Sequence, residues 1–188
     1  ERAVEYPYQT RKKFPDRHLV LAGEIIHNPH VNDKLRGMGI EIMAAEEDGK
    51  LDFSAIKPDD VVILPAFGVT IEAFEALRTI GCVLVDTTCG SVLNVWKRVE
   101  SYARDGFTAL IHGKYYHEET RATASQVMKY PGGSYLDVLH MEEAQLVCDY
   151  TEGRMTHDAF LAKFATSASH GVDPDMPCTD MGEASKKT

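Results

Sequence analysis

Closely spaced cysteines are absent from this sequence. Its four cysteines lie far apart and form no CxxC pair: Cys82, Cys89, Cys148 and Cys178. A small secreted disulfide scaffold would be denser in cysteine, and a zinc ribbon would show paired thiols. We therefore expect reduced thiols, as in a cytosol-like compartment.

Long apolar runs and an excess of basic residues are also absent. No apolar run approaches the roughly 18 to 20 residues that a membrane span needs. Lysine and arginine number 20 against 29 acidic residues, for a net charge of -9. This balance disfavours broad nucleic-acid binding, because a phosphate backbone attracts clustered basic side chains. A small anion held by a few local donors remains compatible with it. The first residues, ERAVEYPYQTRKKF, have the pattern of an amphipathic segment, not of a signal or transit peptide.

Short apolar runs alternate with helical patterns along the whole chain. The expected strands are 18–26, 40–45, 61–68 and 82–88, followed by a strand with its loop over 107–116 and a turn and strand over 130–139. Between them, Asn28 is the expected N-cap of a helix that begins at Pro29, and Thr70 caps a helix that ends at Gly81. Such alternation predicts an α/β fold with parallel strands. The turn at Cys89 divides it into two similar α/β domains, 1–89 and 90–188.

Chemically useful residues follow four of these strands. They are His27, Phe67-Gly68, Cys89 and the run His117-Glu118-Glu119. In parallel α/β sheets, functional groups collect at the carboxyl ends of strands. Because all four follow the carboxyl end of a predicted strand, these residues are site candidates.

Cys89 has the strongest local argument, because a helix is predicted to begin directly after it. A helix N-terminus stabilises a thiolate, which is the nucleophilic and metal-binding form. Three interpretations stay open from the residues alone: a packed thiol, an activated nucleophile as in a cysteine hydrolase, or a ligand of an iron–sulfur cluster. Cys82 and Cys148 are expected in the core, and Cys178 is expected to be free and inert.

The two histidines suggest anion binding. His27 precedes a helix start, where backbone N–H groups favour an anion and an imidazole can donate one more hydrogen bond to phosphate. The alternative is a histidine bonded to nearby backbone. His117 and Glu119 together could hold an anion and move a proton, with Glu118 as a competitor for that role. The alternative for this run is a solvated helix start, whose dipole favours acidic residues.

Taken together, the segments resemble one family. GEIIHNPHVNDKLRGMGI, VVILPAFGVTIEAFEAL, VDTTCGSVLNVWKRVESYARDGFTALIHGKYYHEETRATAS and VCDYTEG resemble 4-hydroxy-3-methylbut-2-enyl diphosphate reductase. That family contains the iron–sulfur enzymes of the last step of the methylerythritol phosphate route to isoprenoids. The PAFG and HEETRATAS segments are similar to the plant and cyanobacterial branch.

The resemblance implies a fold and a set of roles. The family has three α/β lobes in pseudo-threefold arrangement around a central [4Fe-4S] cluster, held by three cysteines, of which Cys89 matches the middle one. His27 and His117 match the histidines that hold the substrate diphosphate. Glu119, not Glu118, matches the glutamate that passes a proton to the departing hydroxyl group.

The implied reaction is a reductive dehydroxylation that gives isopentenyl and dimethylallyl diphosphate. Ferredoxin or flavodoxin is the implied electron donor. The implied location is the cytoplasm of a bacterium, or a plastid if the source is a photosynthetic eukaryote.

The resemblance also predicts what this chain lacks. Family members continue on both sides of the matched region, so we expect a chain truncated at both ends, without its third domain and without the first and third cluster cysteines. This chain alone is then expected to be inactive. Gly90 replaces the usual proline after the cluster cysteine, and Phe67 replaces a third diphosphate histidine of many bacterial members, a change shared with the plant-like branch. The role of Thr188 stays undecided. Two other functions remain: a cluster-free diphosphate-binding module, and a cysteine hydrolase that uses Cys89.

Overall fold

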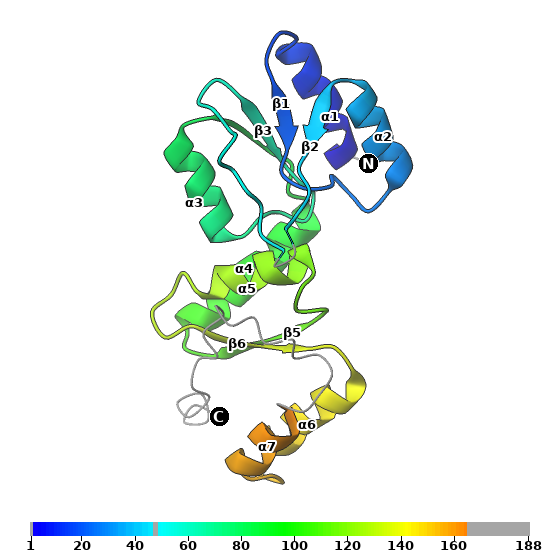
Figure 1. The fold of residues 1–188 in the computed structure, drawn as a ribbon. Helices are drawn as coiled ribbons and strands as arrows, with labels where there is room; N and C mark the ends of the chain where they lie inside the picture. Colours follow the sequence, from blue (N-terminus) through cyan, green and yellow to red (C-terminus); the bar gives the residue numbers. More distant parts are fainter. Residues whose placement is uncertain (1, 47–48, 165–188) are drawn as a thin grey trace. The chain divides into compact units, whose positions relative to one another are not determined.

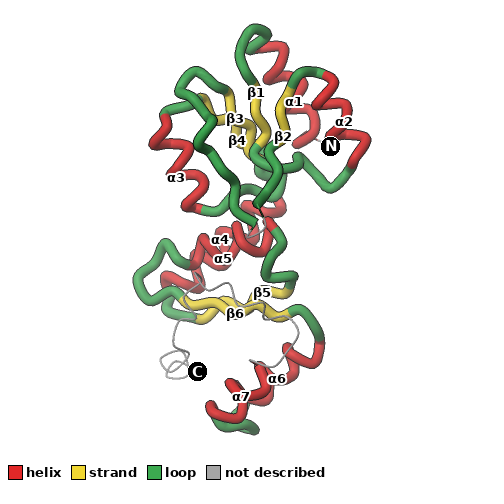
Figure 2. Tube along the Cα trace, in the orientation of Figure 1, coloured by secondary structure: helices red, strands yellow, loops and turns green. Residues whose placement is uncertain are grey.

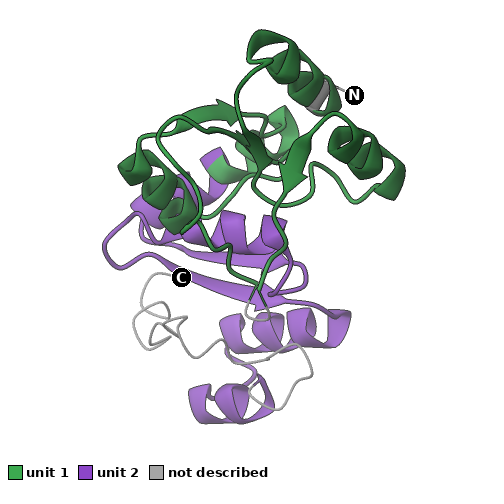
Figure 3. Cartoon of the chain, turned by 45° about the horizontal axis from the view of Figure 1, so that its top comes forward, with its two compact units in different colours: residues 1–96 green, residues 97–188 purple. Residues whose placement is uncertain are grey.

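The computed structural model describes residues 2–46 and 49–164 (Figure 1). The chain forms two compact units, Glu1–Trp96 and Lys97–Thr188, which are described separately (Figure 3). Within the described ranges, no helix is long and apolar enough to cross a membrane. Thr188 and Cys178 lie outside these ranges.

The first unit contains a four-stranded parallel sheet. Its strands are β1 (Leu19–Leu21), β2 (Ile40–Ile42), β3 (Val61–Leu64) and β4 (Val83–Asp86), in the spatial order β2-β1-β3-β4. All four run in the same direction, with Leu19 beside Ile40 on one side and beside Val61 on the other. The predicted α/β class with parallel strands is therefore confirmed.

Successive strand residues point to opposite faces of this sheet, so both faces carry apolar side chains. Helices cover both faces. One face packs against α1 (Arg2–Lys13) and α2 (Pro29–Gly37). The other face packs against α3 (Ile71–Ile80) through Leu77 and Phe74. Every residue of β1 and β3 is buried. Burial of each valine, leucine or isoleucine side chain in these two strands contributes about 1.5–3 kcal/mol to the free energy of folding.

Local capping signals set the helix boundaries as the sequence predicted. The Asn28 side chain accepts hydrogen bonds from the backbone of His30 (3.1 Å) and Val31 (3.3 Å), and α2 begins at Pro29. Thr70 Oγ1 accepts from the backbone N–H of Ala73 at 3.3 Å and begins α3. α3 ends at Gly81, whose φ of 81° is left-handed. These predictions are confirmed.

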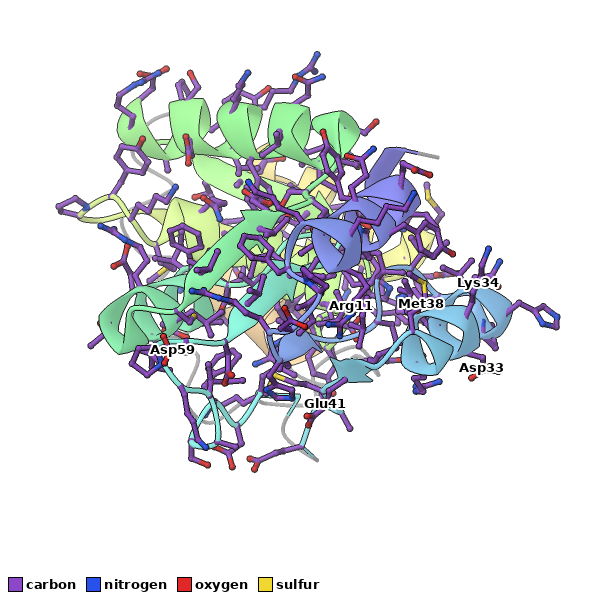
Figure 4. The ribbon with its side chains drawn as sticks, turned by 90° about the horizontal axis from the view of Figure 1, so that it is seen from above. Arg11, Asp33, Lys34, Met38, Glu41 and Asp59 are labelled. Carbon is purple, nitrogen blue, oxygen red and sulfur yellow. The ribbon has the colours of Figure 1, made fainter. Side chains whose placement is uncertain are left out.

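Arg11 joins the end of α1 to the turn that follows α2 (Figure 4). Its guanidinium donates to the carbonyl of Gly39 at 2.5 Å and to the carbonyls of Phe14, Pro15 and Arg17 at 3.4, 3.3 and 3.0 Å. One side chain thereby satisfies several carbonyls that follow helix ends. This contact fixes α1 against the rest of the first unit.

The second unit is built on two parallel strands, β5 (Thr108–His112) and β6 (Ser134–Val138), joined through α5 (Glu118–Val127). α4 (Gly90–Arg104) begins in the first unit, and its last turns contribute Val99 and Ala103 to a cluster with Ala109 and Val127. α6 (Met141–Thr151) and α7 (His157–Phe164) follow β6 (Figure 2). Val138 is buried in a cluster with the rings of Phe160 and Phe164.

The expected core position of Cys148 is wrong. Its side chain is exposed, while Ala144, Val147 and Tyr150 of the same helix pack against the cluster that α7 completes. Cys148 follows Val147 directly and so points about 100° away around the helix. Cys82 is half-buried and packs against the core of the first unit, as expected.

Candidate functional site

Three loops meet at the carboxyl edge of the first sheet, because β1, β3 and β4 are parallel neighbours. They are residues 22–28, 65–70 and 87–89. The backbone N–H of Ala66 donates to the carbonyl of Ile25 at 3.2 Å, and the N–H of Cys89 donates to the carbonyl of Ala66 at 2.8 Å. The central loop therefore holds the loop of His27 on one side and that of Cys89 on the other.

His27 lies at the end of the first of these loops, with its side chain 50% exposed. Its Nδ1 is 3.2 Å from Glu24 Oε2. Its ring stacks on the ring of Phe67, with centroids 4.9 Å apart and planes 18° from parallel. Both of these contacts are to side chains.

Cys89 ends the third loop and is half-buried. Its carbonyl accepts from the backbone N–H of Leu93 at 3.0 Å, so the residue begins α4 as predicted. The preceding turn is closed by Asp86, whose Oδ1 accepts from the backbone N–H of Thr88 (2.9 Å) and from its hydroxyl (2.6 Å). The DTTC segment is thus a short turn that presents a thiol at a helix N-terminus.

Gly68 is required by two features of the central loop. Its φ is +78°, and a Cβ placed there would overlap the indole ring of Trp96 on α4. Glycine adopts this backbone conformation without strain, and only glycine leaves room for the ring. Trp96 thereby packs against the backbone that carries Phe67.

We expect Gly68→Ala to lower the free energy of unfolding by about 2–3 kcal/mol, because the cost of a left-handed alanine adds to that of overpacking. Urea denaturation measures this change. The matched control is Gly81→Ala, since Gly81 has nearly the same φ, 81°, with no heavy atom within 4 Å of its added Cβ. Equal losses in the two variants would contradict the packing of Trp96 on Gly68.

In the second unit, His117 is the N-cap of α5. Its Nδ1 accepts from the backbone N–H of Glu119 at 3.2 Å and lies 3.9 Å from Glu118 Oε2. A ring nitrogen that accepts an N–H carries no hydrogen itself, so the neutral ring holds its proton on Nε2 and can donate from there. Glu118 and Glu119 are both exposed in the first turn of the helix. His117 and Glu119 therefore share one helix start, where an anion is favoured.

The residues of the first unit fit one ligand position of an iron–sulfur cluster. Clusters of this kind are held by several cysteine thiolates. Within the described ranges, Cys82 precedes β4 at the opposite edge of the sheet, and Cys148 is exposed on α6. Cys89 can thus supply one thiolate, and the described residues at this edge do not supply the others.

Sequence reasoning missed Glu24 and Trp96 as parts of this edge. Glu24 stands three residues before His27, and that spacing alone does not distinguish a partner from a surface acid. Trp96 lies in an apolar pattern of helical spacing with Val92 and Val99, which predicts packing but names no partner. Its contact with Gly68 joins residues 28 positions apart and depends on the sheet that brings their loops together.

Comparisons with known proteins cover most or all of this chain. The family model described as LytB protein matches residues 1–170. A 4-hydroxy-3-methylbut-2-enyl diphosphate reductase of Synechococcus sp. (strain WH7803) is 47% identical over 188 residues, which are 100% of this chain and 46% of that protein. The enzyme of the same name from Thermosynechococcus vestitus is also 47% identical, over 45% of its length. The chain thus spans about half the length of these curated relatives.

Solved structures of similar fold carry related names. One, of (E)-4-hydroxy-3-methyl-but-2-enyl diphosphate reductase, the terminal enzyme of the non-mevalonate pathway, superposes with a TM-score of 0.61 and 26% identity, over 75% of this chain and 48% of its own. Another, the E-1-hydroxy-2-methyl-but-2-enyl-4-diphosphate reductase from Plasmodium falciparum, gives a TM-score of 0.63 at 18% identity, over 90% and 65% of the two chains. The second likeness concerns the fold alone.

Proposed function

Because the chain belongs to the LytB protein family, we propose that it forms part of a 4-hydroxy-3-methylbut-2-enyl diphosphate reductase. The family predicted from the motifs is confirmed, and the curated relatives named above come from the cyanobacterial branch, as expected. In this proposal, 1–89 and 90–188 are two of the three α/β domains of the reductase. The cysteine hydrolase considered from the sequence has no support in this family.

The observation that carries the proposal is the arrangement of the carboxyl edge in the first unit. Two backbone hydrogen bonds connect the loop of His27, the loop of Phe67 and the turn of Cys89 in that order. The proposed diphosphate ligand His27 and the proposed cluster ligand Cys89 are thus held on one sheet edge. A reductase of this kind must hold the substrate diphosphate at a fixed distance and orientation from the cluster, and one shared sheet edge can do so.

In the proposed reaction, the C–O bond of the allylic alcohol breaks, two electrons and two protons are taken up, and water leaves. His27 and His117 donate hydrogen bonds to the diphosphate and hold it in place. Glu119 gives one proton to the hydroxyl oxygen as it departs. Cys89 supplies one thiolate to the cluster, which provides electrons and a Lewis acid when bound. Reduced ferredoxin or flavodoxin is the proposed electron source, in a bacterial cytoplasm or a plastid.

Calorimetry with isopentenyl diphosphate tests the assignment of the histidines. We expect the 188-residue chain to bind it, and His27→Asn and His117→Asn each to weaken binding about 10- to 150-fold, because a charge-assisted hydrogen bond contributes about 1.5–3 kcal/mol. His30→Asn is the matched control, since this exposed histidine lies in the first turn of α2. Unchanged affinity in both variants would contradict the two assigned roles.

A cluster-free diphosphate-binding module is the second candidate. The single thiol at the described sheet edge favours it. In that case the chain would bind isopentenyl diphosphate and would not retain iron after anaerobic reconstitution. Retention of a cluster by the protein as its source cell makes it would exclude this candidate.

A further inference from the structure

The imidazole of His27 is held by two side chains with no role of their own in the proposed chemistry. Phe67 lies flat against one face of the ring, and Glu24 meets its Nδ1 at 3.2 Å. We propose that Phe67 and Glu24 are positioning residues for His27. This inference rests on the proposed diphosphate-binding role of that histidine.

Phe67 is a rigid support for the ring. Its side chain is only 8% exposed. The residues on either side of it are fixed through their backbones, since the Ala66 N–H donates to Ile25 and the Gly68 N–H donates to Pro65 at 3.0 Å. The ring plane of Phe67 is therefore set by the sheet edge and not by the ligand. Stacking on Phe67 holds the His27 ring nearly parallel to it, because offset-parallel aromatic pairs attract each other.

Glu24 fixes the remaining rotation of the imidazole. A stacked ring can still rotate within its own plane. The Glu24 carboxylate beside Nδ1 favours one of these orientations. Carboxylates orient histidines in this way in many metal and catalytic sites. With Nδ1 turned to Glu24, the nitrogen presented to a phosphate oxygen is Nε2. When both nitrogens carry hydrogen, the ring donates to Glu24 and to the phosphate at once.

Positioning matters here because the His27 side chain is half-exposed. An exposed side chain that must be immobilised by its ligand loses rotamer freedom on binding, and that loss weakens binding about 3- to 10-fold. Phe67 and Glu24 order the ring before the ligand arrives. Their removal should therefore weaken diphosphate binding by this factor without removing any group that touches the diphosphate.

The test compares Phe67→Leu, Phe67→Tyr and Glu24→Gln in the 188-residue chain, with isopentenyl diphosphate as the probe. Phe67→Leu should weaken binding about 3- to 10-fold. Phe67→Tyr should bind the probe as tightly as the wild-type chain does, because tyrosine keeps the aromatic face. Glu24→Gln should weaken binding by a similar factor. Phe74→Leu is the matched control for lost aromatic volume, since Phe74 packs on the α3 face of the same sheet.

A second readout follows the ring itself. In NMR spectra, the Hε1 signal of His27 should carry a ring-current shift from Phe67 that disappears in Phe67→Leu and persists in Phe67→Tyr. A merely structural role of Phe67 would not produce this pattern. The loss of affinity should also vanish when Phe67→Leu is made in a His27→Asn background, because no ring remains to be positioned.

The outcomes separate this inference from the proposed function. If His27→Asn loses affinity while Phe67→Leu and Glu24→Gln bind like the wild type, the inference is wrong and the diphosphate role stands. If the wild-type chain does not bind the probe, the diphosphate role is wrong, and the Hε1 signal decides the inference. A signal unchanged by Phe67→Leu would then overturn it, and a lost ring-current shift would support it.

Discussion

Under the proposed function, a Cys89→Ser variant of the protein, as its source cell makes it, should lose the visible absorption of an iron–sulfur cluster and more than about 100-fold of the proposed reductase activity. A serine hydroxyl stays protonated at neutral pH and is a poor ligand for iron, whereas cysteine sulfur is the usual protein ligand of iron–sulfur clusters. The fold should survive, because Cys89 is anchored through its backbone to Ala66 and Leu93, and serine is a favourable residue at a helix start.

Two controls separate this effect from a general effect of removing a thiol. Cys82→Ser and Cys148→Ser should both keep the cluster. Burial raises the pKa of the Cys82 thiol, which disfavours its thiolate, and Cys148 is exposed on α6. If Cys89→Ser retains full absorption and activity, Cys89 is not a cluster ligand and the proposed assignment is wrong.

An Asp137→Asn variant should be more stable than the wild-type chain at pH 8 by up to about 4 kcal/mol. Asp137 lies in β6, where burial raises the pKa of its carboxyl group from 3.8 to about 7. Its Oδ1 is buried without a hydrogen-bond partner. The difference of about three pH units between the folded and unfolded carboxyl corresponds to about 4 kcal/mol, which the fold loses when the group is ionised.

The sign of this effect fixes its pH dependence. Between about pH 4 and pH 7, folded Asp137 holds a proton that the unfolded chain has released, so stability falls as pH rises through this range. Asp137→Asn should remove this slope and should change stability little at pH 4. Urea denaturation from pH 4 to 8 measures it, with Asp105→Asn as a control at an exposed carboxylate. An equal effect of Asp137→Asn at both ends of the range would contradict the raised pKa.

The sequence predicted those features that depend on neighbouring residues. Asn28, Pro29, Thr70 and Gly81 act within a few residues, so their helix boundaries were placed correctly. The strands were predicted too long. β1 ends at Leu21 because Gly23, with φ of +100°, turns the chain. The spacing of Val92, Val95, Trp96, Val99 and Tyr102 predicts one apolar stripe on α4. That prediction is wrong in part, since Val95 and Tyr102 are 46% and 49% exposed while Val99 is buried.

The candidate site could be predicted only as a set of strand ends. His27, Cys89 and His117 lie at such ends in the structure, as expected. The contact between His27 and Phe67 could not be predicted, because it joins residues 40 positions apart and depends on β1 and β3 being neighbours. The buried carboxyl of Asp137 was missed because its segment, SYLDV, has the pattern of an ordinary strand. The division into 1–89 and 90–188, and the roles of His27, Cys89, His117 and Glu119, stay predictions.

The most direct test of the proposed function is anaerobic turnover of 4-hydroxy-3-methylbut-2-enyl diphosphate by the protein as its source cell makes it, with reduced methyl viologen as electron donor. We expect isopentenyl and dimethylallyl diphosphate as products. If protein with a reconstituted iron–sulfur cluster forms neither product, the assignment of this chain to a reductase is wrong.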